Sequence, residues 1–301
     1  MQGNEKGSAP WRDGLASPIA EGSLERAMEA TARYGVRIAN EAADSLQEAA
    51  ETLRLLGYAV VDSGLTAEEL DALRIRFAEL YAAEAVGPRG ELRRAAGEAE
   101  LLRCPLALDP AFLALAANPR ILALCESLIG PGFILNQQNG VVNPAGAQTY
   151  SQSPFHRDLP YQHYVSTRPL ALNALFCLDP FTEENGATWV VPASHKEEAF
   201  PSEPVLRAQK RQVSAPAGSF LVLDCMLWHG GGVNRSAKDR RAVNHVFTIA
   251  MMRQQIDLPS ALGEGFTDDP DLRRLLGFQH PQARSVTEYL AMQAAKRQRP
   301  R

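Results

Sequence analysis

Several features are scarce in this 301-residue sequence, and each absence excludes a class of protein. No apolar run approaches the roughly 20 residues that a membrane-spanning helix needs. The opening stretch lacks the apolar core of a secretory signal, so we expect none. The formal net charge is −4, which gives no electrostatic reason to expect nucleic acid or an anionic membrane as a partner. A cytoplasmic protein without either partner is therefore predicted, and assembly into a homo-oligomer is left open.

Cysteine is also rare, with four residues at positions 104, 125, 177 and 225. They form no CxxC motif, and three of them lie inside apolar runs. This pattern indicates buried free thiols in a reducing compartment, and it offers no zinc or disulfide framework.

The order of the expected elements divides the chain into four parts. Residues 1–21 form a predicted flexible tail, and residues 22–55 form a helical segment rich in Ala, Glu and Leu. Residues 56–260 are the main domain, and residues 261–301 are a polar, partly helical extension. Within the main domain helices come first and short strands follow, which favours an α+β fold with a mainly β core backed by helices.

Local signals support individual elements of the main domain. Residues 58–62 read as a short strand, and Thr66 with Glu69 three residues later forms the pattern of a helix capping box. From residue 131 onward, strand-like runs are separated by Gly, Pro, Asn and Asp. The pair Asn185-Gly186 stands between two such runs and predicts a β-hairpin there.

The stretch "SPFHRDLPYQHY" contains the first candidate site residues, His156 and Asp158. Residues i and i+2 of an extended chain project to the same side, so both side chains can reach one metal ion. His229 ends the apolar run "FLVLDCMLW" and precedes three glycines, which makes it the third candidate ligand. Two histidines and one carboxylate are the facial triad of non-haem Fe(II) oxygenases. Catalytic zinc accepts the same set, although no HExxH motif is present, and ordinary structural histidines remain the alternative.

An arginine follows the third candidate ligand at a spacing that suits a co-substrate contact one strand later. Arg240 lies 11 residues after His229, where the next strand is expected to start. An oxygenase that uses 2-oxoglutarate needs a cation for the remote carboxylate, and the planar guanidinium suits a bidentate contact. Strand alternation turns Arg241 to the opposite face. The alternative for Arg240 is an exposed pair with Asp239.

From about residue 56 to 255 the chain resembles the phytanoyl-CoA dioxygenase family of Fe(II)/2-oxoglutarate-dependent oxygenases. The matching pieces, in the family's order, are "LGYAVVDSGLTAEELDAL", "NPRILALCESLIGPG", "FHRD", "EENGATWVVPASH" and "WHGGGVNRS…RR". The resemblance implies a double-stranded β-helix, or jelly-roll, core. It implies His156, Asp158 and His229 as catalytic iron ligands, with Arg240 as the 2-oxoglutarate anchor. The cofactors are then Fe(II), with 2-oxoglutarate and O2 as co-substrates.

Several further positions are expected near this site. Thr188 corresponds to a threonine that meets 2-oxoglutarate in relatives, and Gln137 is favoured over Gln138 because "NQQN" is polar for a strand heading to the core. Tyr161 and His163 are expected at the substrate mouth. Two departures from the family concern loops: Ala193 and Ser219 stand where the family has Gly and Asp. Because alanine disfavours positive φ, we expect a differently shaped loop around Ala193.

The resulting hypothesis is an enzyme that hydroxylates a small-molecule metabolite or natural product and releases succinate and CO2. A cupin-like metal enzyme that does not use 2-oxoglutarate is one alternative, and a non-catalytic metal-binding relative is another. The sequence does not identify the substrate. Desaturation, epoxidation and rearrangement need the same ligands, so hydroxylation is only the default expectation.

Overall fold

The computed structural model describes residues 42–159 and 163–298. The predicted tail, most of the predicted N-terminal helical segment and Tyr161 lie outside these residues. The helices are α2 (Ser45–Leu56), α3 (Ala67–Ala83), α4 (Gly87–Ala95), α5 (Pro105–Leu108), η2 (Pro110–Phe112), α6 (Leu113–Ala116), α7 (Pro119–Leu128), η3 (Ser194–Lys196), α8 (Glu203–Gln209), α9 (Leu258–Leu262), α10 (Pro270–Leu275) and α11 (Val286–Gln298).

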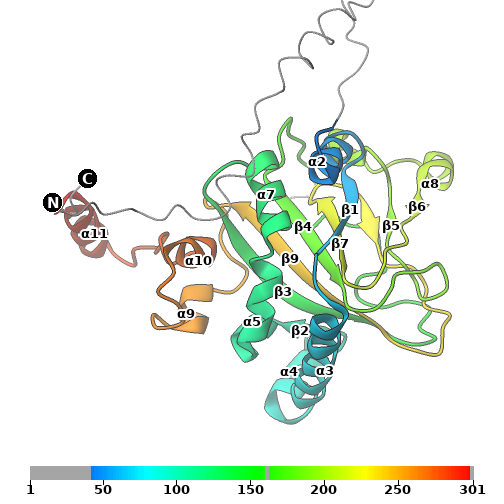
Figure 1. The fold of residues 1–301 in the computed structure, drawn as a ribbon, viewed down its shortest axis with the longest axis horizontal. Helices are drawn as coiled ribbons and strands as arrows, with labels where there is room; N and C mark the ends of the chain where they lie inside the picture. Colours follow the sequence, from blue (N-terminus) through cyan, green and yellow to red (C-terminus); the bar gives the residue numbers. More distant parts are fainter. Residues whose placement is uncertain (1–41, 160–162, 299–301) are drawn as a thin grey trace, which may run out of the picture.

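Two antiparallel sheets form the centre of the molecule, which confirms the α+β class (Figure 1). The larger sheet has the order β1-β7-β4-β9-β3-β2, and the smaller sheet has the order β6-β5-β8. The expected strand at residues 58–62 is β1, which pairs with β7. The strands are β1 (Tyr58–Asp62), β2 (Leu101–Arg103), β3 (Phe133–Asn143), β4 (Ala171–Cys177), β5 (Trp189–Val190), β6 (Arg211–Gln212), β7 (Ser219–Asp224), β8 (His229–Gly230) and β9 (Arg240–Ile249).

Helices cover one face of the larger sheet, with α2 and α7 lying across it (Figure 1). Helix α3 begins at the predicted capping box: Thr66 Oγ1 accepts from the Glu69 N–H at 3.2 Å, and the Glu69 carboxylate accepts from the Thr66 N–H at 2.8 Å. The main hydrophobic cluster joins these helices to the sheet and contains the fully buried Phe77 and Phe112. Truncating either ring to alanine would cost about 3–5 kcal/mol.

Alternation along β4 separates two environments. Leu172 and Phe176 belong to the cluster under the helices, whereas Cys177 belongs to a cluster on the opposite face, with Phe181. Asn173 shares the parity of Cys177 and therefore faces away from the helices as well. On that side the smaller sheet packs against the larger one, because Val190 of β5 shares a cluster with residues of β7. The space between the two sheets is where the candidate ligands meet.

The predicted hairpin at Asn185-Gly186 is wrong, although a turn is present there. Gly186 has φ of 76°, and the Thr182 N–H donates to Asn185 Oδ1 at 2.9 Å. The flanking strands β4 and β5 do not pair, because β4 lies in the larger sheet and β5 in the smaller one. The turn therefore carries the chain from one sheet to the other.

The C-terminal helices differ in how they contact the rest of the molecule. Leu258 of α9 and Leu275 of α10 belong to the main cluster, whereas α11 has no buried residue and lies away from the sheets (Figure 1). All four cysteines are free and buried, as predicted. Among the described residues no single helix has the length and hydropathy to cross a membrane, and one pair bent by 45°, Pro110–Ala116 with Pro119–Leu128, meets these criteria only when taken together.

Candidate metal centre

Three backbone contacts bring the candidate ligands to one place between the sheets. His156 and His229 form an isolated antiparallel bridge, with the His156 N–H donating to the His229 carbonyl at 2.8 Å and the reverse contact at 3.1 Å. The Asp158 N–H donates to the Cys225 carbonyl at 3.0 Å, in the turn that follows β7. The segment from His156 to Asp158 is therefore held against the chain that leads into β8.

The three side chains converge as a metal site requires. One ligand atom from each of His156, Asp158 and His229 lies within 4.8 Å of the others. Asp158 Oδ1 is 4.0 Å from His156 Nε2 and 3.7 Å from His229 Nε2. Ligands about 2.1 Å from a metal and perpendicular to one another lie about 3.0 Å apart. The three ligand atoms are therefore close together but slightly too far apart for a bound metal. Each histidine–aspartate pair would have to approach by about 1 Å.

Hydrogen bonds determine which histidine nitrogen faces the centre. His156 Nδ1 lies 2.8 Å from the Pro154 carbonyl oxygen, and His229 Nδ1 lies 2.9 Å from the Leu227 carbonyl oxygen. A carbonyl can only accept, so each Nδ1 carries the proton and each Nε2 presents a lone pair toward Asp158. Burial lowers the pKa of His229 below its ordinary value, which favours the neutral form that binds metal.

The carboxylate is also oriented by a neighbour that the sequence did not reveal. Asn173 of β4 donates from Nδ2 to Asp158 Oδ2 at 2.8 Å. That bond occupies one carboxylate oxygen and leaves Oδ1, which faces both histidines, for a metal. Asp158 would therefore contact a metal through its single free oxygen, as the carboxylate of a facial triad does.

Arg240 lies on the same inner side of the larger sheet and is almost fully buried, with 2 % of its surface exposed. Its Cζ stands 4.0 Å from the centre of the Phe181 ring, and its Nη2 donates to the Tyr150 hydroxyl at 3.1 Å. Nε and Nη1 are buried and have no hydrogen-bond partner among the described residues. The alternative of an exposed pair with Asp239 is excluded by this burial.

Arg241 points the other way, as strand alternation predicts. Its guanidinium makes a bidentate pair with Asp179, with Nε–Oδ2 at 2.9 Å and Nη2–Oδ1 at 2.8 Å. This carboxylate holds the pKa of Arg241 above its usual value. Of the two neighbouring arginines, only Arg240 therefore offers unsatisfied donors to a ligand.

Tyr150, a second residue that sequence reasoning missed, reaches Arg240 because of a glycine. A Cβ at Gly231 would overlap the Tyr150 hydroxyl oxygen, so no side chain fits there. The run of three glycines after His229 was the available signal, since it marks close approach of another segment. Nothing in the sequence indicates that the approaching residue is Tyr150.

The remaining candidate positions are Gln137, Thr188 and His163, and the structure supports them to different degrees. Gln137 is opposite Val246 on β9 and shares its face, away from the helices. Gln138 is buried under the helices, where it donates to the Phe112 carbonyl and contacts His245 Nε2, so the preference for Gln137 agrees with the register. Thr188 is buried just before β5, and its contact with 2-oxoglutarate stays a prediction. The exposed His163 follows the undescribed segment 160–162.

The sequence predicts a differently shaped loop around Ala193 because alanine disfavours positive φ, and this premise is wrong. Ala193 adopts φ of 63°, in the left-handed region. Its N–H donates to the Leu56 carbonyl at 2.8 Å. The alanine thus takes the conformation that suits glycine, at a cost of about 1 kcal/mol. Ser219 is buried at the start of β7 and bonds the Pro216 carbonyl.

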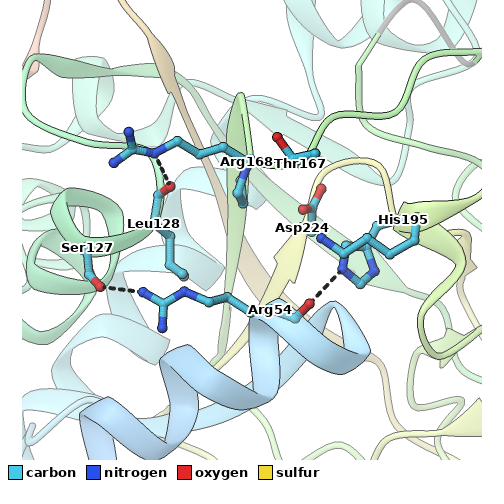
Figure 2. A pocket seen from close by; sticks show the side chains of 9 residues that line it. Arg54, Ser127, Leu128, Thr167, Arg168, His195 and Asp224 are labelled. Atoms are coloured by element: carbon cyan, nitrogen blue, oxygen red, sulfur yellow. Dashed lines mark hydrogen bonds between the residues drawn. The ribbon is translucent and has the colours of Figure 1, made fainter. Parts of the chain in front are cut away.

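A cavity of about 330 Å³ lies on the helix-covered side of the larger sheet, opposite the metal centre (Figure 2). Arg54 and Arg168 extend toward the end of α7, where they donate to Ser127 Oγ and to the Leu128 carbonyl. Asp224 has the parity of Phe220 and Val222, which pack under the helices. Since Asp158 meets Asn173 on the opposite face, this cavity is not the metal centre. Its lining residues are Arg54, Ser127, Leu128, Thr167, Arg168, Pro169, His195, Lys196 and Asp224.

Comparisons with known proteins identify the family to which the chain belongs. The family model "Phytanoyl-CoA dioxygenase (PhyH)" matches residues 53–242. The uncharacterized protein Rv1501 of Mycobacterium tuberculosis is 34% identical over 251 residues, covering 81% of this chain and 91% of that one. The iron/alpha-ketoglutarate-dependent dioxygenase penM of Penicillium thymicola is 29% identical over 142 residues, covering 44% and 45%. The structure of EctD from S. alaskensis with 2-oxoglutarate and 5-hydroxyectoine has a TM-score of 0.59 at 22% identity, covering 73% and 81%.

The class that emerges is that of the Fe(II)/2-oxoglutarate-type dioxygenases, with a His-Asp-His metal site between two sheets. Within this class, the chain belongs to the phytanoyl-CoA dioxygenase family.

Proposed function

We propose that the chain hydroxylates a small-molecule substrate in a reaction that consumes 2-oxoglutarate and O2. The observation that carries this proposal is Arg240, a buried cation whose Nε and Nη1 have no partner among the described residues. A buried charge without a counter-charge is costly. The far carboxylate of 2-oxoglutarate would supply that counter-charge in bidentate form, a role that suits an arginine at this position.

We infer that the two sheets are a double-stranded β-helix, or jelly roll. The bridge between His156 and His229 adds a fourth segment to the smaller sheet β6-β5-β8. Strands β3, β9, β4 and β7 of the larger sheet stand opposite these four segments. In this arrangement the ligand-bearing segments are neighbours in the smaller sheet, and Arg240 begins a central strand of the larger one.

The residues present suit the proposed roles. His156, Asp158 and His229 are assigned as the ligands of Fe(II), which when bound supplies the redox chemistry that reduces O2 and oxidises the substrate. Arg240 is assigned to the remote carboxylate of 2-oxoglutarate, and Phe181 forms the apolar floor beneath the guanidinium. The Tyr150 hydroxyl accepts from Arg240, so its own proton is available for the same carboxylate.

The overall reaction balances without further redox partners. The substrate C–H and O2 react with 2-oxoglutarate to give the alcohol, succinate and CO2, with one oxygen atom in each of the alcohol and succinate. Asp158 supports hydroxylation, because its carboxylate fills a position that would otherwise admit a competing anion. We assign Thr188 to the pocket wall because it is buried, and Gln137 because it lies on the inner face of β3.

Succinate formation tests the proposal directly. Protein reconstituted with Fe(II) and ascorbate is incubated with 2-oxoglutarate and a panel of small molecules under air. We expect slow uncoupled succinate release without substrate and faster release with an accepted substrate. The His229→Ala variant, which lacks one ligand, is expected to form none. Binding of Fe(II) by the wild type without any succinate or any 2-oxoglutarate binding would favour a metal enzyme of another kind.

A further inference from the structure

Arg157, the residue between the two ligands His156 and Asp158, is buried although it takes no part in the metal site. Alternate residues of an extended segment project to opposite sides. The Arg157 side chain therefore points away from the metal centre, on the side opposite to His156 and Asp158. Only 2 % of its surface is exposed. A buried arginine requires specific contacts that repay the loss of hydration.

Those contacts include a cluster of backbone carbonyls in one short turn. Arg157 Nη2 donates to the Ser194 carbonyl at 3.0 Å and to the Glu197 carbonyl, and Nη1 donates to the Glu198 carbonyl at 3.2 Å. The turn begins with η3, which follows β5 along the chain. One guanidinium therefore ties the segment of the first two ligands to this turn, which we call the η3 turn (residues 194–198).

The same guanidinium reaches the residue that precedes the third ligand. Arg157 Cζ lies 4.5 Å from the centre of the Trp228 ring, a cation–π contact. The backbone of Trp228 is itself held by this region, because its N–H donates to Ser194 Oγ at 2.9 Å and its carbonyl accepts from the Val191 N–H at 2.9 Å. His229 follows directly in the chain.

We propose that Arg157 is a positioning residue that sets the spacing between the His156–Asp158 segment and His229, an inference that rests on the proposed role of these three residues as metal ligands. The ligand atoms lie 3.7–4.0 Å apart across Asp158 and must close by about 1 Å around a metal. Functional geometries of this kind depend on supports that hold ligands to about 0.5 Å. Arg157 acts on both sides of the triad at once, through the η3 turn and Trp228.

A lysine cannot replace this contact fully. Its ammonium is a single point donor, which reaches one carbonyl and cannot lie flat on the indole ring while serving the others. Arg157→Lys should therefore retain charge and fold but lose part of the positioning, and Arg157→Gln should lose both the stacking and most of the donors. Loss of a partner that orients metal ligands typically weakens metal binding about 10–100-fold.

The test measures metal affinity rather than turnover. Mn(II) and Co(II) are titrated anaerobically into the wild-type, Arg157→Lys and Arg157→Gln proteins, and the visible spectrum of Co(II) is recorded. We expect dissociation constants raised by about 10–100-fold in Arg157→Gln and by less in Arg157→Lys. The Co(II) spectrum should change as well, because its bands report the arrangement of the ligands.

Two controls separate positioning from general loss of stability. Arg241→Gln removes a comparably bonded arginine whose carboxylate partner, Asp179, is not part of the triad. Leu115→Ala opens a cavity under the helices, where Leu115 is fully buried, and should lower the melting temperature. Neither control should change metal affinity by more than about 2-fold when measured below its own melting temperature.

The outcomes distinguish this proposal from the proposed enzyme function. Unchanged metal affinity and an unchanged Co(II) spectrum in the folded Arg157→Lys and Arg157→Gln proteins overturn the positioning role and leave the oxygenase reading intact. If Arg157→Gln does not fold, the Arg157→Lys measurement decides. A wild type that binds metal but never forms succinate overturns the oxygenase reading, while the comparison of affinities still tests Arg157.

Discussion

Arg240→Met should have opposite effects on the protein without and with 2-oxoglutarate. Without the co-substrate, Arg240 is a buried cation with two donor atoms unpartnered among the described residues. Methionine is of similar length, is uncharged and suits the Phe181 ring against which Arg240 lies. We therefore expect the melting temperature of the unliganded variant to equal or exceed that of the wild type, since removal of an unpaired buried charge relieves a desolvation cost.

With 2-oxoglutarate the same change should be strongly unfavourable. Loss of one partner of a buried, hydrogen-bonded charge pair costs about 2–5 kcal/mol, which corresponds to an affinity about 30-fold lower or more. At a concentration about 100 times the wild-type dissociation constant, 2-oxoglutarate should stabilise the metal-loaded wild type by about 2.7 kcal/mol. For a variant that binds about 30-fold more weakly, the same concentration stabilises by only about 0.9 kcal/mol. Arg240→Lys should lie between the two.

The assay is thermal unfolding of the metal-loaded proteins across a range of 2-oxoglutarate concentrations, alongside the 2-oxoglutarate dependence of succinate formation. Arg241→Met is the matched control, because its pair with Asp179 points away from the site. It should lower stability by about 1 kcal/mol, in line with a partly exposed pair, and leave the 2-oxoglutarate constant unchanged. A large shift in Arg241→Met with none in Arg240→Met would refute the assignment, and no shift in either would remove the main support for 2-oxoglutarate binding.

Three further changes have defined expectations. Ala193→Gly should raise the free energy of unfolding by about 0.5–1 kcal/mol in urea titrations, because Ala193 holds φ of 63°; a loss of stability would contradict the strain. Gly231→Ala should displace Tyr150, because the added methyl group would overlap the tyrosine hydroxyl. The apparent dissociation constant of 2-oxoglutarate should then rise by about 10-fold, because a hydrogen bond at a charged group is lost. An unchanged dissociation constant would exclude Tyr150 from the site. Burial lowers the pKa of His245 from 6.5 to about 4, so the unfolded chain takes up the proton first and stability falls as the pH drops from 6.5 toward 4. Between about pH 7.5 and pH 5 the wild type should lose about 2 kcal/mol more than His245→Leu, and equal losses would contradict this cause.

The candidate metal site could be predicted well from the sequence because its key relations are local. His156 and Asp158 stand two residues apart, and strand periodicity alone sends both to one side. The same periodicity separated Arg240 from Arg241, and the structure confirms that only Arg240 faces the inner side. The capping box at Thr66 and the burial of all four cysteines were also readable from short patterns.

What required the tertiary structure is every relation between segments far apart in the chain. Asn185-Gly186 favours a turn by its own chemistry, but whether the flanking strands pair depends on partners elsewhere, and β4 pairs with β7 and β9 instead. Tyr150 meets Arg240 across 90 positions, and Asn173 of β4 meets Asp158, which lies outside the strands. Arg157 stands between two ligands in the sequence, and only the structure shows that it is buried against Trp228. Local sequence determines which way a side chain points, whereas the packing of the two sheets decides what it meets there.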